Sequence, residues 1–310
     1  MSVSVDWVIL GLGIPAAAAA LIALFGLKPR GGREASPPRA AGTWAILIAA
    51  GMALALPMLH GMPAEDAWGR PLALMEWHRW LWFGLLPMAV AGVLLGWPGR
   101  PRWIGLVLGA VTTVAVLVGE LWGRIQNTWE AGETTVWIAG LSAGTLALAA
   151  GGHWLSKRAG RELPPILGLT AVGAGLTVAF SGSESIGLTL VCLGAVMAGG
   201  GAMALFAGCR SAYGSAVPSL FVLAAMLSAA YFLTYNTYAD EPGVLPIEAL
   251  ALAFSPLLGL LSDAILPRRM DHPVVRATAR TVITLAPIVA VTVRAGLRFA
   301  ATVDETGAYY

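Results

Sequence analysis

Apolar residues form long runs along this chain, and short polar segments separate the runs. A helix needs about 20 mainly apolar residues to cross the hydrocarbon core of a membrane. Ten segments meet or approach this length: 7–27, 43–62, 80–98, 103–123, 135–155, 165–181, 187–208, 217–235, 245–266 and 281–299. The pattern predicts an all-α fold, a polytopic bundle of about ten transmembrane helices that forms a single domain over residues 1–310.

The composition supports a membrane protein. The chain is 57% hydrophobic and only 12% charged, whereas a soluble domain carries about 25% charged residues. A chain with so few charges cannot cover a water-facing surface, so we expect the lipid bilayer to be its main solvent. The net charge of +2 and the lack of a phosphate-gripping Lys/Arg cluster argue against a nucleic-acid partner.

The basic residues predict the orientation of the bundle, because Lys and Arg concentrate in cytoplasmic loops. With the N-terminus outside, the inner side holds fourteen of the nineteen basic residues: Lys28, Arg30, Arg33, Arg39, Arg100, Arg102, Lys157, Arg158, Arg161, Arg210, Arg268, Arg269, Arg276 and Arg280. We therefore predict that both ends face outside and that 28–42 is an inner linker. This charge pattern is typical of a bacterial inner (cytoplasmic) membrane protein.

Glycine-rich stretches leave two readings open. The three glycines of "MAGGGAMAL" (197–205) allow close helix packing, or they break a helix so that backbone carbonyls meet a solute. The Gly140/Gly144 pair has the GxxxG spacing that favours close contact between membrane helices. A weak five-plus-five inverted repeat, a common plan of transporters, would relate "TTVWIAG" at 134–140 to "RTVITLA" at 280–286.

Ionisable residues at the outer helix ends are the candidate site. Glu120 would line a polar vestibule that opens to the outside, because ionisable groups within membranes are usually functional. The other residues at outer ends that would contribute to this vestibule are His60, Glu76, His78 and Glu248.

Arg294 is the most unusual charge in the sequence. It follows Arg280 by about 21 Å of helix, so it lies within the outer leaflet, where an arginine costs about 2.5–3.5 kcal/mol or somewhat less. We expect a carboxylate partner, with Glu248 ahead of Glu120 because consecutive helices are usually neighbours. Arg298 is expected to extend to the outer surface instead.

The sequence contains no motif for soluble-type catalysis or metal binding and identifies no cofactor, so an enzyme is the less favoured class. The leading hypothesis is a transporter-like protein that moves a small solute through the outer vestibule. The alternative is a non-catalytic membrane subunit with protein partners in a larger complex, contacting quinol at its outer, aromatic-rich face. A transporter requires a central cavity between similar halves, whereas a subunit leaves a broad face uncovered.

Overall fold

The computed structural model describes residues 9–28, 36–60, 84–96, 102–158, 162–207, 214–234, 243–265 and 273–306. Every regular element within these ranges is helical: a π-helical turn η1 (Ile9–Gly13), then α2 (Ile14–Leu27), α3 (Pro37–His60), α5 (Leu86–Gly96), α6 (Arg102–Glu120), α7 (Trp122–Asn127), α8 (Ala131–Arg158), α9 (Leu163–Phe180), α10 (Glu184–Phe206), α11 (Ala216–Thr234), α12 (Pro246–Ile265) and α13 (Pro273–Thr306). The predicted all-α bundle is confirmed.

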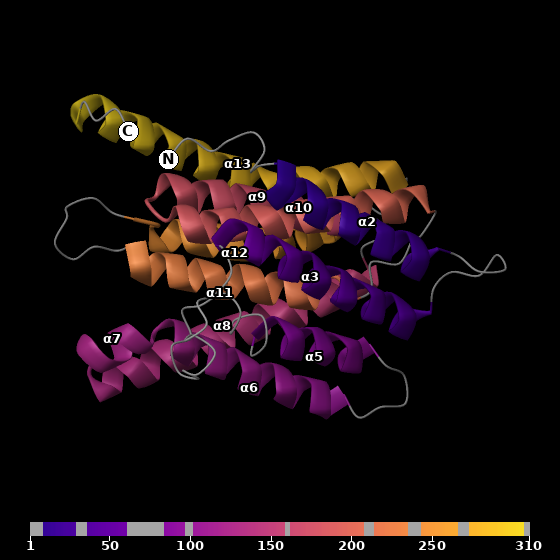
Figure 1. Cartoon of the computed structure of the whole chain (residues 1–310), viewed down its shortest axis with the longest axis horizontal. Coiled ribbons are helices and arrows are strands. Elements are labelled where there is room, and N and C mark those ends of the chain that lie inside the picture. The colour runs from indigo at the N-terminus through magenta and orange to yellow at the C-terminus, as the bar shows by residue number, and fades with distance from the viewer. Residues whose placement is uncertain are drawn as a thin grey trace.

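Five of the described helices, α3, α8, α9, α10 and α13, are long and apolar enough to cross a membrane. Shorter apolar helical stretches belong to α2, α5, α6, α11 and α12. Figure 1 shows the helices side by side along the long axis of the molecule, with α13 at one edge of the view and α6 at the other. The chain is thus a helical membrane bundle, while ten spans and an outer N-terminus stay predictions.

Helix α11 lies at the centre of the bundle. It packs against α3, α5, α6, α8, α9, α10 and α12, and nearly all of its described side chains are buried. Phe221, Leu220 and Ala230 are among its least exposed residues. A helix that is apolar on every side is stable only when other helices or lipid surround it, and here neighbouring helices surround α11.

Glycines bring α9 and α10 into close contact. A methyl group on Gly175 would stand 2.5 Å from the carbonyl oxygen of Gly187, and one on Gly194 would stand 2.8 Å from that of Gly168. The glycines therefore let the two backbones approach at two levels, as small residues do between membrane helices.

The three consecutive glycines of α10 also serve close packing. Gly199 faces the backbone of Ala16 in α2, Gly200 faces Leu47 in α3, and Gly201 faces Pro165 in α9. Helix α10 continues through them from Glu184 to Phe206. Of the two readings of this stretch, the structure thus supports close packing, and the broken helix is absent from this described segment.

The helix packing gives the inverted repeat no support. In a five-plus-five repeat, the first segment corresponds to the sixth and the fifth to the tenth. If the sixth and tenth segments pack together, the first and fifth should do so as well. Helices α9 and α13, which correspond to the sixth and tenth, pack extensively. Helices α2 and α8, which correspond to the first and fifth, form no comparable contact in the described part of the chain.

Candidate functional site

Glu248 occupies the first turn of α12, and its side chain is fully buried, with 0% exposure. The Leu245 backbone N–H donates a hydrogen bond to Glu248 Oε2 at 3.1 Å. A glutamate at the third helical position commonly accepts the N–H of the residue that precedes the helix. This position near the helix N-terminus also favours the negative charge, because the helix dipole is positive there.

Arg298 of α13 is the main partner of this carboxylate. Its Nη2 atom donates to both Glu248 oxygens, at 2.9 Å to Oε1 and 2.7 Å to Oε2. The contact joins α12 to α13, which pack against each other along their length. The buried carboxylate therefore has a charged partner and a backbone donor, as a buried charge requires.

The predicted ion pair between Arg294 and Glu248 is present as a long contact, whereas the expectation that Arg298 extends to the outer surface was wrong. Arg294 Nε stands 3.9 Å from Glu248 Oε1, beyond hydrogen-bond distance, and the Arg294 side chain is 60% exposed. The Arg298 side chain is 29% exposed. We define Glu248, Arg294 and Arg298 as the outer ion cluster.

Helix periodicity explains why the two arginines differ. Arg298 follows the buried Arg280 by eighteen residues, or five turns at 3.6 residues each, so both lie on one face of α13. Buried Ile288 and Ala295 lie on this face as well. Arg294 lies at the edge of the face and points largely to the exterior. Depth alone suggested Arg294, but the helix face decides which arginine meets the carboxylate.

A second ion pair connects the other end of α13 to the start of α9. Arg280 Nη1 donates to Glu162 Oε1, next to the start of α9. The Arg280 side chain crosses α12 at Gly259, where an added methyl group would stand 2.7 Å from Arg280 Cγ. The sequence analysis assigned Arg280 to the inner side and named no partner for it. The absence of a side chain at Gly259 gives Arg280 the space to pass α12, and this packing could not be seen in the sequence.

The remaining candidate residues are not brought together by the described structure. Glu120 ends α6 and His60 ends α3, and their side chains lie outside the described residues. Glu76 and His78 also lie outside the described residues. The outer vestibule therefore stays a prediction, and only Glu248 and Arg294 of the candidate set have described surroundings.

Aromatic rings cluster where α7, α8 and α11 meet. Trp129 and Trp137 stack with ring centroids 6.3 Å apart, and Phe232 meets them edge-on at 5.0 and 5.2 Å. Arg124 Nη2 donates to the Phe232 carbonyl oxygen at 2.7 Å. Carbonyls in the last turn of a helix lack partners in the helix itself, so Arg124 satisfies one of them and ties α7 to α11. Sequence analysis did not anticipate this contact.

The middle of α8 exposes only small residues. Its exposed positions between Ile138 and His153 are Ala139, Gly140, Ala143, Ala147 and Ala150, which we define as the α8 small-residue face. Methyl groups on Gly140 or Gly144 would meet no atom within 4 Å. The GxxxG pair therefore lies beside open space here, and the close contact that its spacing predicts is not made within the described chain.

The described residues contain no group of three or more His, Cys, Asp or Glu side chains that could hold a metal ion.

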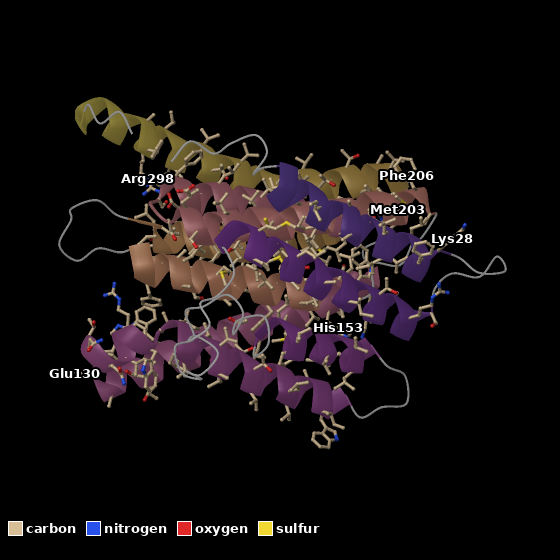
Figure 2. All side chains as sticks on the ribbon, viewed as in Figure 1. Lys28, Glu130, His153, Met203, Phe206 and Arg298 are labelled. Atoms are coloured by element: carbon tan, nitrogen blue, oxygen red, sulfur yellow. The ribbon has the colours of Figure 1, made fainter. Side chains whose placement is uncertain are left out.

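Figure 2 places Arg298 and Glu130 at one end of the bundle and Lys28 and Phe206 at the other. Within the outer ion cluster, the hydrogen bonds between Arg298 and Glu248 join α13 to α12. Comparisons with protein-family models, curated proteins and solved structures found no match for the chain.

Proposed function

We propose that the chain is a non-catalytic membrane subunit of a larger complex and that the α8 small-residue face contacts a partner. The observation that carries this proposal is a contrast between helices. The exposed positions of α6 and α13 carry mainly large apolar residues, such as Leu106, Val111, Val289 and Leu297. Those in the middle of α8 carry only alanine and glycine.

The physics of membrane helices gives this contrast its meaning. Lipid tails are as apolar as leucine, so burial of apolar surface does not drive one membrane helix against another. Close van der Waals packing does, and small residues permit it by letting backbones approach. Within this chain, glycines that serve such packing have neighbours, as at Gly175 and Gly187. Gly140 and Gly144 have none among the described residues, which favours a neighbour supplied by another chain.

The transporter hypothesis has less support. Two of its sequence arguments were a glycine-broken helix and two similar halves, but α10 is continuous and the helix packing does not follow the repeat. Helix α11 fills the centre of the described bundle. Glu248, one of the proposed vestibule residues, is fully buried and bonded. These features favour a packed core over a solute pathway.

The test is site-specific photo-crosslinking in the native membrane. A benzoylphenylalanine replaces Ala147 on the small-residue face. The matched control replaces Val289, an exposed position of α13. Ala147 lies about 15 Å of helix from the basic residue Lys157, and Val289 lies about 14 Å from Arg280, so the two positions have similar depth. We expect Ala147 to give a crosslinked adduct of discrete mass that contains another membrane protein, and Val289 to give none.

Two results would reject the subunit role. One is equal crosslinking from both positions, which would indicate random collisions in the membrane. The other is no adduct from either position while the protein is purified alone in mild detergent.

A further inference from the structure

We propose that Arg294 binds the phosphate of an anionic phospholipid at the outer ion cluster. This proposal is independent of the subunit role, because it concerns α13 and not α8. The first observation behind it is the charge balance of the outer ion cluster. The cluster holds two guanidinium groups and one carboxylate, and both oxygens of that carboxylate accept hydrogen bonds from Arg298. Counting only these three described side chains, the cluster has one more positive than negative charge.

Arg294 carries the excess charge. Its Nε atom is 3.9 Å from Glu248 Oε1, and the described part of the chain offers it no nearer carboxylate. Its side chain is 60% exposed, so other molecules can reach it. A guanidinium at the level of the hydrocarbon is costly without an anionic partner or contact with the headgroup layer, and an anionic headgroup would supply both.

The surroundings of Arg294 fit a lipid better than a free anion. Val293 and Leu297 flank it on α13, and Leu297 is 68% exposed. Ile247, at the start of α12 beside the cluster, is 67% exposed. These apolar side chains would contact acyl chains while the guanidinium reaches the headgroup.

The depth and the chemistry of Arg294 also agree with a phosphate group. Arg294 lies about 6 Å of helix below Arg298, and a long arginine side chain can extend toward the interface from that level. The planar guanidinium can donate two parallel hydrogen bonds to a phosphate, whereas the ammonium of lysine acts as a point charge. We therefore assign the site to a phosphodiester of net negative charge.

The test uses the full chain, purified and stripped of lipid in an uncharged detergent. Dioctanoyl phosphatidylglycerol, dioctanoyl phosphatidylcholine and inorganic phosphate are titrated separately, and bound adducts are counted by native mass spectrometry. We expect phosphatidylglycerol to bind more tightly than the other two. Arg294→Gln should weaken its binding about tenfold, since a charged hydrogen bond is lost, and Arg294→Lys should weaken it less.

Lys28 provides the matched control. It is an exposed cation at the opposite end of the bundle, so Lys28→Gln removes the same charge and should leave binding unchanged. If Arg294→Gln does not fold, phosphatidylglycerol binding is measured with a second variant, Arg294→Leu, instead. The proposal is overturned if the Arg294 variants bind phosphatidylglycerol as the parent does. It is also overturned if phosphatidylcholine or inorganic phosphate binds equally well, which would remove the anionic lipid as the ligand.

Discussion

At the scale of single residues, Glu248 depends on Arg298 far more than on Arg294. The carboxylate is fully buried, and removing one partner of a buried ion pair strands the other in a medium that solvates it poorly. Arg298→Leu should therefore lower the free energy of unfolding by about 3 kcal/mol. Arg294→Leu should change it by less than about 1 kcal/mol, because this side chain is exposed and makes no hydrogen bond to Glu248.

Thermal unfolding in detergent measures both variants, and a double variant checks the mechanism. Glu248→Leu with Arg298→Leu removes both charges, so it should be less destabilising than Arg298→Leu alone. If Arg294→Leu proves the more damaging single change, the assignment of partners in the outer ion cluster is wrong.

The sequence predicted the carboxylate of this cluster and its ion pair with Arg294, but not its hydrogen-bonded partner, Arg298. Glu248 was accessible to sequence reasoning because it stands at a helix start next to an apolar run. The choice between Arg294 and Arg298 was not, because it depends on which face of α13 meets α12. That face becomes visible only when Arg280, Ile288 and Ala295 are known to be buried.

At the scale of helices, the same glycine-to-valine substitution should destabilise α9 strongly and α8 very little. Gly175→Val would push a side chain into the Gly187 carbonyl and should cost about 1–3 kcal/mol or more through overpacking. At Gly144 an added Cβ would meet no described atom within 4 Å, so valine should fit there. Both replace a helical glycine by valine, so propensity changes equally and the difference reports packing.

Unfolding of the purified chain should separate the two variants. Gly144→Val should unfold close to the parent temperature and Gly175→Val well below it. Gly144→Val should also reduce crosslinking from Ala147 in the native membrane, because the added bulk would hold a partner helix away. Equal loss of stability in both variants would mean that the α8 small-residue face is packed within the chain.

Helix positions could be predicted from sequence, and helix neighbours could not. The length of an apolar run reports whether a helix can cross a membrane, and the described helices agree with the predicted segments to within a few residues at most ends. Glycine spacing is less informative. Gly140 and Gly144 have a spacing typical of close contact, yet only the structure distinguishes their open face from the filled ones in α9 and α10.

At the scale of the whole molecule, the central position of α11 could not be read from its sequence. In a soluble protein, apolar residues mark the buried face of a helix. In a membrane, the lipid-facing surface is as apolar as the core. Helix α6, with exposed Val107 and Val111, is therefore also largely apolar although it lies at the edge of the bundle. Composition predicted the bundle, but helix order within it required the coordinates.

The orientation of the bundle gives the last prediction. Lys28 and Phe206 lie at one end and Glu130 and Arg298 at the other (Figure 2). Helix α8 begins beside Glu130 and carries Lys157 near its other end, the end with Lys28. Because Lys and Arg are retained in the cytoplasm during insertion, this end should face the cytoplasm and the outer ion cluster the opposite compartment.

Reporter fusions test this orientation at two places. Alkaline phosphatase, which is active only outside the cytoplasm, should be active after Tyr310 and inactive within 28–42. A green fluorescent protein should give the reverse pattern, because it requires the cytoplasm to mature. The reverse result at both places would mean that the bundle has the opposite orientation in the membrane. It would also put the Arg294 site in the inner leaflet. A cytoplasmic signal after Tyr310 alone would mean that α13, despite its length, does not carry the chain across.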